Sequence, residues 1–483
     1  MYTWMPVSAA TGLTDLKNHI PPEYDPEGVS TKLASGISAA VKAVLIEQPY
    51  IDKDYRSTYY NFYAKKGQRY RADCVRLHFF DDAVAFEQAA MRLRCSDRLT
   101  DHYFGYVVLR PTGIATIGRS VVSPDVRTGA PRYIISGRHK VHVLGYKLEV
   151  QGFPSMDQHI DISVCAHVAC WSILRHYSER YSVYREFLTH DITMMAQEFN
   201  PGGLVPSKGL QLSHAERVFQ EAGTFPILVA QGPAGKGDTP FYRQLLAYVD
   251  SGFPLFAAMH DLGHAIAVVG YEWRKPSLGT APGMRYAWDE VQSLAVVDDN
   301  HLPYLSIPLT GSSDYAADDI DAFIVALPEK IYYPADAIDR FASKGLFAFG
   351  GVVDLPAKDQ AIIRYFITTA ASFRGFVREY ESEFDPKLVE LIMTLPLAQF
   401  IWIIEFATEA QWQTGQISAR AVVDATASLR EVMPLWLFHN RSQAVVCDRR
   451  SVPNDDLHAF VLSGNTHTAF TRMVQNLRPT QTK

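Results

Sequence analysis

The stretch ISVCAHVACWSIL, residues 162–174, places two of the chain's five cysteines beside a histidine and a tryptophan. We expect a helix here, beginning near Cys165 and running toward Tyr177. Three interpretations of the cysteine pair are open at this point: a metal clip, two core cysteines, or a helix that opens with a nucleophile. The third is chemically favourable at Cys165, because the positive end of a helix dipole favours the reactive thiolate.

A metal site in this stretch would draw on four donors: Cys165, His167, Cys170 and His176. Positions i and i+2 of a helix diverge by about 200°, so Cys165 and His167 would face apart. Zinc clips also prefer closely spaced cysteines outside regular helices. The sequence therefore predicts neither a metal nor another cofactor.

Two apolar segments further along the chain supply the partners that a nucleophilic cysteine needs. His264 opens the β-branched run GHAIAVVGYEW, residues 263–273, and is expected at the mouth of a buried strand. Asp298 ends a second such run, LAVVDDN, residues 294–300. If the two strands are neighbours, the carboxylate can orient the imidazole. Together with Cys165 they form the nucleophile, base and orienting group of a thiol acyl-transfer enzyme.

Three segments carry a resemblance to a known family: DQHIDISVCAHVACWSILRHY at 157–177, GHAIAVVGYEW at 263–273 and LAVVDDN at 294–300. They resemble the signature blocks of the papain-like cysteine peptidase superfamily, and most closely those of its bacteriocin-processing (double-glycine) peptidase-like branch. The resemblance implies a catalytic triad of Cys165, His264 and Asp298. It also implies that the side chain of Gln158 helps to hold the oxyanion, a role worth about 10²–10³ in rate.

The choice of nucleophile depends on which pattern within the superfamily is followed. Papain itself has Cys followed directly by Trp, which favours Cys170, whereas the bacteriocin-processing pattern has a small residue after Cys and a Leu nine positions on. Cys165, followed by Ala166 and with Leu174 nine positions later, fits the second pattern. We therefore assign Cys165 as the nucleophile and Cys170 as a packed neighbour. Ala166 in place of the usual Gly, and His167 after it, are departures that reshape the substrate cleft.

Other residues compete for the roles of base and orienting group. His260 lies four positions before His264, but it precedes a loop-like Asp–Leu–Gly rather than a strand. Asp299 and Asn300 compete with Asp298, which is favoured by its place at the strand end. Each of these residues taken singly is more often structural than catalytic. The ordered set of candidates in one chain is what favours catalysis.

Composition and charge exclude several other classes of protein. The formal net charge is −6, with 47% hydrophobic and 20% charged residues, which predicts a globular chain that binds neither nucleic acid nor an anionic membrane. The most apolar segment, residues 388–407, contains Glu390, Pro396 and Glu405, so two buried helices divided at Pro396 are expected rather than a membrane span. Five scattered cysteines and an N-terminus unlike a signal peptide predict a reducing cytoplasm.

We expect four regions along the chain. Residues 1–35 are expected to form an irregular N-terminal lead-in, and residues 36–149 a small α+β region. Residues 150–333 are expected to form the papain-like peptidase domain, an α+β core whose catalytic helix packs on an antiparallel sheet. Residues 334–483 are expected to be mainly helical, because DPKLVELIMTL opens with an N-cap aspartate and a proline, and ISARAVVDATASLREV at 417–432 has a helical pattern. The flanking regions are expected to present the substrate or dock a regulatory protein partner.

These expectations define one principal function and two alternatives. The principal function is a cysteine peptidase or isopeptidase that cleaves a peptide or amide bond of a protein or peptide substrate through a thioester. The first alternative keeps the thioester but passes the acyl group to an amine, as a thiol acyltransferase or transpeptidase does. The second is a non-catalytic binding or scaffold protein on a degenerate peptidase fold, which the large flanking regions suggest.

Overall fold

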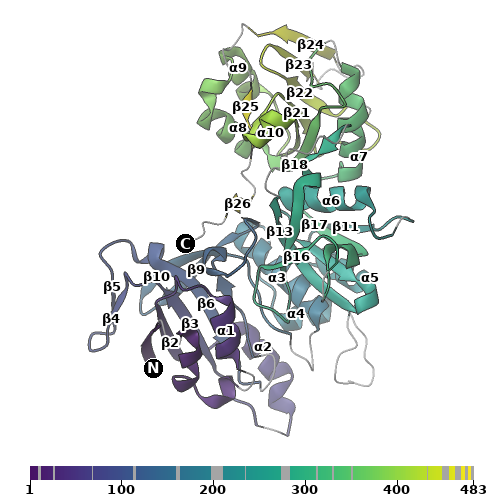
Figure 1. The fold of residues 1–483 in the computed structure, drawn as a ribbon. Helices are drawn as coiled ribbons and strands as arrows, with labels where there is room; N and C mark the ends of the chain where they lie inside the picture. The colour runs from purple at the N-terminus through teal and green to yellow at the C-terminus, as the bar shows by residue number, and fades with distance from the viewer. Residues whose placement is uncertain are drawn as a thin grey trace.

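The computed structural model describes most of the chain. The residues outside this description are 9–11, 26–27, 68, 113–115, 159–163, 197–209, 234, 274–282, 312–313, 329–330, 350–351, 432, 449–455, 463–468, 474–476 and 480–483. The described chain is a mixed α+β structure, which confirms the expected class, and three large sheets follow one another through the molecule (Figure 1). In Figure 1 the purple N-terminal region lies beside the teal middle region, and the green and yellow C-terminal region lies beyond it.

The N-terminal region is a five-stranded sheet with helices on both faces. Its strands stand in the order β1, β2, β3, β6 and β7, which span Tyr2–Pro6, Ala43–Tyr50, Cys74–Phe80, Tyr103–Leu109 and Val121–Val122. Helix α1 (Val29–Gly36) packs on the face that carries Val44, and α2 (Lys53–Asn61) packs on the face that carries Leu45. Both faces of the sheet are therefore buried, which explains why its strands read as nearly continuous apolar runs.

The expected irregular lead-in at residues 1–35 is wrong. Its first residues form β1, an edge strand that pairs antiparallel with β2, and its last residues form most of α1. Met5 of β1 and Leu33 of α1 are both buried against the sheet. Tertiary burial therefore orders two short segments whose own sequence pattern is weak.

The middle region is built on an antiparallel sheet. Its main strands stand in the order β11, β17, β12, β13, β15 and β16, which span Phe225–Ala230, Ala322–Leu327, Leu255–Met259, His264–Trp273, Val291–Val297 and Leu305–Pro308. Its helices are α3 (Cys165–Arg180), α4 (Thr189–Ala196), α5 (Leu212–Glu221) and α6 (Thr239–Asp250). Phe256 on β12 meets Phe219 of α5, whereas Phe323 on β17, whose side chain points to the other face, meets Phe241 of α6. Helices α3 and α5 therefore cover one face, and α6 covers the other.

The C-terminal region is a seven-stranded sheet, so the mainly helical structure expected for 334–483 is wrong. Its strands stand in the order β14, β18, β19, β21, β22, β23 and β24, which span Arg285–Tyr286, Ile362–Thr369, Phe400–Ala407, Ala419–Asp424, Leu435–His439, Gln443–Asp448 and Asp456–Val461. Helices α8 (Ala370–Glu379) and α9 (Pro386–Thr394) lie between β18 and β19 along the chain. Of the two helices expected over 388–407, the first is α9, and the second is replaced by strand β19.

Burial explains why the C-terminal strands were mistaken for helices. All eight residues of β19 are buried, and so are all six residues of β21, which lies within the segment 417–432. A strand buried on both faces has no alternation of apolar and polar residues. A short apolar run of this kind cannot be distinguished from a buried helix by periodicity alone.

The three regions exchange strands across their expected boundaries. Strand β8 (Tyr133–Ile134) belongs to the N-terminal part of the chain but pairs with β13 of the middle sheet. Strand β26 (Arg478–Pro479), close to the C-terminus, pairs in turn with β8. Strand β14 comes from the middle region and pairs parallel with β18 of the C-terminal sheet. One continuous apolar core consequently joins the middle and C-terminal regions.

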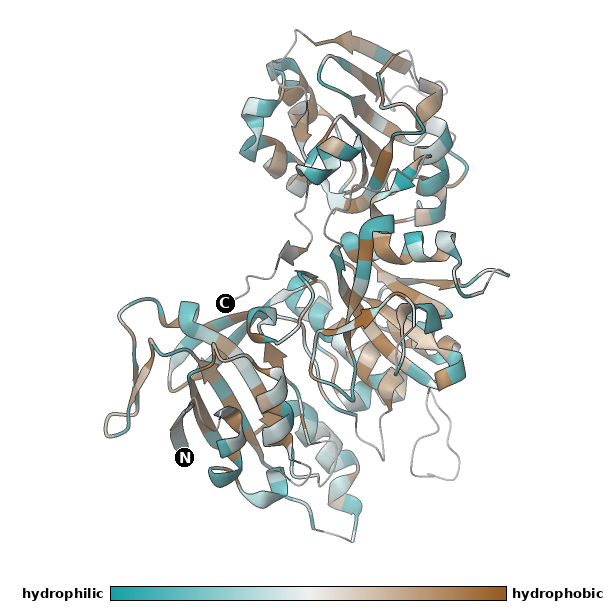
Figure 2. Ribbon diagram, in the orientation of Figure 1, coloured by the Kyte–Doolittle hydropathy of each residue, from teal (hydrophilic) through white to brown (hydrophobic). Residues whose placement is uncertain are grey.

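The hydropathy of the residues follows this arrangement of sheets. In Figure 2 the hydrophobic residues lie mainly along the strands, and the hydrophilic residues lie mainly on the helices and connecting turns. Among the described helices, none combines the length and the apolar character that crossing a membrane requires. The apolar segment around 388–407 instead contributes α9 and β19 to the C-terminal core.

Candidate active site

The two cysteines of ISVCAHVACWSIL occupy different environments in helix α3. Cys165 is the first residue of the helix and is only partly buried. The His167 side chain accepts a hydrogen bond of 3.4 Å from the main-chain N–H of Val164, and the N–H of His167 donates to the Val164 carbonyl at 2.9 Å. The N–H groups of Cys165 and Ala166, at the first two positions of the helix, have no partner within the helix. Cys170 is fully buried, and burial raises the pKa of its thiol well above the usual range. Cys165 is therefore the cysteine that is placed for chemistry.

His264 is placed by a tight turn between β12 and β13. It is the first residue of β13 and pairs with Met259, the last residue of β12. Gly263, immediately before it, has φ of 58°, a left-handed conformation that favours glycine. The turn therefore presents the imidazole at the end of the sheet, half-buried beside the start of α3.

Asp298 follows β15 directly, and its side chain contacts His264, the first residue of the neighbouring strand β13. The distance from Asp298 Oδ2 to His264 Nε2 is 3.1 Å. The main-chain N–H of Asn300 donates to Asp298 Oδ1 at 2.7 Å, and the Tyr315 hydroxyl donates to Oδ2. Burial opposes ionisation of Asp298, but its hydrogen bonds with His264, Tyr315 and Asn300 hold the pKa of this carboxyl well below its usual range.

Cys165 and His264 line the same cleft, and the interaction of the imidazole with the Cys165 thiol helps to raise the pKa of His264. Because Nε2 of the imidazole faces Asp298, Nδ1 is the nitrogen that remains for the sulfur. Burial favours the neutral imidazole, but the hydrogen bonds and charges of Asp298 and Cys165 outweigh it and raise the pKa of His264 to about 10. The arrangement therefore favours an imidazolium at neutral pH in the cleft that Cys165 also lines.

Cys165 and His264 open into a cleft of about 500 Å³. Its other lining residues come mainly from the segment that starts α5 and from β12, and they include Leu210, Gln211, Leu212, Phe256, Ala258 and Met259. The walls are predominantly apolar, with the sulfur and the imidazole as the reactive groups. Such a cleft suits an apolar side chain held next to a bond that the sulfur attacks.

Gln158, the expected oxyanion residue, is not among the residues that line this cleft. It is half-buried, and its main-chain carbonyl accepts a hydrogen bond of 3.4 Å from Arg110. Residues 159–163, between Gln158 and α3, lie outside the described part of the chain. The structure thus places Cys165 and His264 in one cleft with Asp298 bonded to the imidazole, whereas Gln158 is not among the residues that line this cleft.

The competing residues are less well placed than the assigned ones. Asp299 Oδ1 is 4.0 Å from His264 Nε2, farther than Asp298, and burial together with the charge of Asp298 raises the pKa of Asp299 to about 7. His260 also lines the cleft but is exposed, and in the described part of the chain it forms no ion pair with a carboxylate. Asn300 contributes its main-chain N–H to Asp298.

One group of residues has the spacing of a metal site: the ligand atoms of His264, Asp298 and Asp299 lie within 4.8 Å of one another. Asp298 already accepts hydrogen bonds from three donors, and His264 directs Nε2 at one of its oxygens. A metal would have to displace these bonds, and the group offers only three protein ligands. The donor set therefore fits a His–carboxylate pair better than a metal centre.

Tyr315 is a site residue that the sequence did not reveal. It lies in the turn that follows β16, where no apolar periodicity marks its position. Its hydroxyl contacts Asp298, and its ring centroid is 5.9 Å from that of His264. Gln211, at the start of α5, is a second such residue, because it lines the cleft that Gln158 does not reach.

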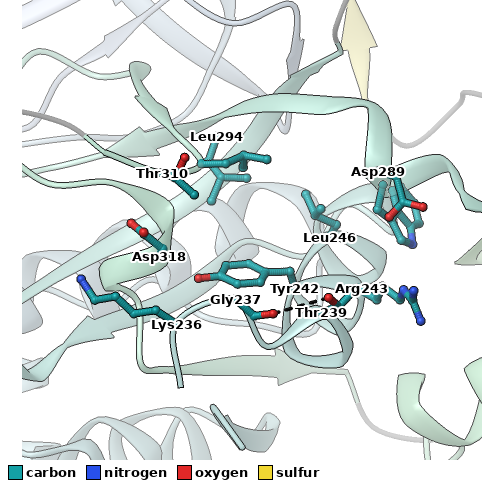
Figure 3. A pocket seen from close by; sticks show the side chains of 12 residues that line it. Lys236, Gly237, Thr239, Tyr242, Arg243, Leu246, Asp289, Leu294, Thr310 and Asp318 are labelled. Atoms are coloured by element: carbon teal, nitrogen blue, oxygen red, sulfur yellow. Dashed lines mark hydrogen bonds between the residues drawn. The ribbon is translucent and has the colours of Figure 1, made fainter. Parts of the chain in front are cut away.

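A second cavity, of about 380 Å³, lies on the face of the middle sheet that α6 covers (Figure 3). Leu246 and Leu294 form part of its apolar wall, and Lys236 and Asp318 lie at its edge. Lys236 comes from the glycine-rich segment GPAGKGDT and forms an ion pair with Asp319. The cavity has no cysteine and no His–carboxylate pair among its described lining residues, unlike the cleft at Cys165.

No known protein family, curated protein or solved structure matches this chain. The assignment of a function therefore depends on the side chains at Cys165, His264 and Asp298. Their positions arise from local structure: a helix start, a strand start and a strand end. This arrangement is what a thiol nucleophile requires.

Proposed function

We propose that the protein is a cysteine peptidase or isopeptidase with a papain-like core. The observation that supports this most directly is that Cys165 and His264 line one cleft, with the imidazole hydrogen-bonded to Asp298 behind it. A helix start at the sulfur, a half-buried imidazole with a raised pKa and a buried carboxylate each favour the proposed thiolate–imidazolium pair. None of the five cysteines forms a disulfide, which suits a reducing compartment, and we place the enzyme in the cytoplasm.

The proposed reaction begins with attack of the Cys165 thiolate on the carbonyl carbon of a peptide or amide bond. A C–S bond forms, and the carbonyl oxygen carries the negative charge of the tetrahedral intermediate. The C–N bond then breaks while the His264 imidazolium donates its proton to the leaving amine. Water, deprotonated by the now neutral His264, attacks the thioester and releases the carboxylic acid and the thiolate. Asp298 orients the imidazole and stabilises its charged form throughout.

The oxyanion needs donors near Cys165. The main-chain N–H of Cys165 itself, at the start of α3, is one donor that the helix supplies. The family resemblance nominates the Gln158 side chain as the second donor. Gln211 lines the cleft and is the alternative that the geometry favours. Replacing each glutamine by alanine separately distinguishes them, since loss of one oxyanion donor lowers kcat by about 10²–10³-fold.

The proposed nucleophile is tested by Cys165→Ala, with Cys170→Ala as the matched control in the same helix. We expect a thiol-directed covalent probe to label the wild type and Cys170→Ala at Cys165, and to leave this position unlabelled in Cys165→Ala. New protein N-termini that accumulate in cells with the wild type should be absent with Cys165→Ala. Mass spectrometry of the products separates hydrolysis from transfer of the acyl group to an amine.

Two results would reject the proposed peptidase. The first is undiminished turnover by Cys165→Ala, because the proposed reaction cannot proceed without the sulfur. The second is a wild-type Cys165 that reacts no faster than an ordinary exposed thiol and releases no new N-termini. The second result would favour a binding or scaffold protein on a degenerate peptidase fold.

A further inference from the structure

Tyr315 contacts both members of the His–carboxylate pair without lining the cleft. Its hydroxyl donates to Asp298 Oδ2, the same oxygen that faces His264 Nε2. Its ring is tilted 59° to the imidazole, with 5.9 Å between the ring centroids. Tyr315 therefore lies behind the pair, on the side away from the substrate.

The hydrogen bond from Tyr315 fixes the direction of the Asp298 carboxylate. Oδ1 is held by the main-chain N–H of Asn300 at 2.7 Å, within the same turn. Oδ2 is held from outside this turn only by Tyr315 and His264 among the described residues. If the hydroxyl is removed, the imidazole alone must keep Oδ2 in place. The carboxylate then gains freedom to rotate away from His264.

Tyr315 remains a donor throughout the pH range in which the enzyme is expected to work. Burial and the negative charge of Asp298 raise the pKa of its hydroxyl well above the usual range. The other charged groups that act on it are Asp299 and Asp314, and both raise the pKa further. The phenol oxygen consequently keeps its proton and donates it to the carboxylate.

The segment that carries Tyr315 is fixed at several points. The Tyr242 hydroxyl of α6 donates to the carbonyl of Ala317 at 3.1 Å. The N–H of Ala316 donates to Asp319 at 2.9 Å, and the N–H of Asp318 donates to the carbonyl of Leu309 at 3.0 Å. These bonds fix residues 316–318, which follow Tyr315 directly in the chain.

We propose that Tyr315 is a positioning residue, which holds Asp298 against His264 and shields their hydrogen bond from solvent. Its effect on catalysis rests on the proposed peptidase function. It touches neither the substrate nor the sulfur. Its effect on the reaction passes through the orientation of Asp298, and so through the stability of the imidazolium. Loss of the hydroxyl should therefore reduce kcat and leave KM nearly unchanged.

The experiment compares Tyr315→Phe with the wild type, because phenylalanine keeps the ring and removes only the hydroxyl. The first measurement is an NMR titration of histidines in the full chain, with the His264 signal assigned from its absence in His264→Gln. We expect the titration midpoint of His264 to fall by about one pH unit, since each unit is a tenfold change in preference for the imidazolium. The second measurement is turnover, where kcat should fall about tenfold.

Tyr242→Phe is the matched control. It removes another hydroxyl that is bonded to the same segment but does not touch Asp298. We expect this variant to leave the His264 midpoint and kcat unchanged. An equal fall in both variants would assign the effect to the support of the segment, and the proposal for the Tyr315 hydroxyl would be wrong. An unchanged midpoint in Tyr315→Phe would also overturn it.

The two proposals can fail separately. The NMR titration needs no substrate, so it reports on Tyr315 even if the wild type cleaves nothing. A wild type without turnover, together with a lowered His264 midpoint in Tyr315→Phe, would reject the peptidase and keep the positioning role. Turnover that depends on Cys165 but not on the Tyr315 hydroxyl would support the peptidase and reject the positioning role of Tyr315.

Discussion

Two adjacent aspartates at the end of β15 show how neighbouring residues acquire different chemistry. Asp298 accepts hydrogen bonds on both oxygens and is held as the anion. Asp299 is equally buried but lies 4.0 Å from the imidazole, and its pKa is raised to about 7 by burial and by the charge of Asp298. Two carboxyl groups so close together do not both ionise readily. We infer that Asp298 carries the charge and Asp299 keeps its proton below neutral pH.

This difference leads to a prediction for Asp299→Asn. The ordinary pKa of an aspartate is about 3.9, so the unfolded chain loses this proton earlier than the folded chain does. Between about pH 4 and about pH 7 the folded state binds more protons, and the free energy of unfolding therefore falls as pH rises. We expect Asp299→Asn to remove this contribution, so that its stability exceeds that of the wild type increasingly over this range. Urea denaturation at several pH values measures the difference.

Asp298→Asn is the matched variant for Asp299→Asn. We expect it to lower kcat/KM by at least about tenfold and to move the alkaline limb of the activity profile to lower pH, because the anion that supports the imidazolium is lost. Asp299→Asn should retain kcat/KM within about twofold at neutral pH. A reversed result, in which Asp299→Asn is the inactive variant, would exchange the assigned roles of the two residues.

The catalytic candidates could be predicted from sequence because each occupies a marked position. Cys165 opens a helix, His264 opens an apolar strand, and Asp298 ends another. Tyr315 could not be predicted, because no local sequence pattern marks it. Its role arises only when the chain after β16 folds back so that its hydroxyl meets Asp298 and its ring meets His264. Gln158 was nominated by family resemblance alone, and the structure leaves it outside the lining of the cleft.

At the scale of elements, strands were predicted correctly where polar residues bound their apolar runs, and were missed where every residue of the strand is buried. Two strands of the middle sheet were expected where β13 and β15 occur, since polar residues bound their apolar runs. In the C-terminal sheet, β19 follows α9 after a short connection, and both are apolar. Sequence periodicity recognised the helix, whose N-cap Asp385 is visible, but gave no sign of the change to a strand.

The buried charges of the C-terminal sheet provide the next prediction. Glu405 on β19 bonds to Arg364 on β18 at 3.0 Å and to Arg420 on β21 at 2.9 Å, with all three side chains almost fully buried. Arg364 also bonds to Asp250 of α6 at 2.8 Å, which connects this sheet to the middle region. Removing one partner of a buried ion pair leaves an uncompensated charge and costs about 3–5 kcal/mol. We expect Glu405→Gln to lower the free energy of unfolding by about this amount.

Chemical denaturation compares Glu405→Gln with a surface control. Arg340→Gln breaks an exposed pair with Asp336, whose side chains are 62% and 44% exposed, and should change the free energy of unfolding by less than about 0.5 kcal/mol. If the two variants have the same free energy of unfolding, the buried ion pairs of Glu405 do not stabilise the fold, and the prediction is wrong. A broadened transition in Glu405→Gln would indicate that the C-terminal sheet unfolds separately from the remainder.

At the scale of the whole molecule, the catalytic helix is held by the N-terminal region. The Trp171 indole N–H of α3 donates to Asp54 of α2 at 3.0 Å, and both groups are buried. The hydroxyls of Thr58 and Thr189 meet at 2.9 Å in the same interface. The buried side of α3 therefore contacts another region as well as its own sheet. An N-terminal unit attached in this way is part of the support for Cys165.

The exchange of strands leads to the last prediction, for a fragment of residues 150–333. Such a fragment lacks β8, which pairs with β13, and β18, which pairs with its own β14. It also exposes Trp171 and the apolar residues that face the C-terminal sheet. We expect it to show no cooperative unfolding transition by far-UV circular dichroism and no labelling at Cys165 above that of an unfolded thiol. The control is two co-expressed chains, 1–153 and 154–483, divided after β10 (Tyr146–Gly152), which should associate, because the pairings of β8 with β13 and with β26 are then available between them. Cooperative folding and turnover by the 150–333 fragment alone would instead show that the flanking regions are separable from catalysis. In that case their contribution would be to present the substrate or bind a partner, rather than to build the site.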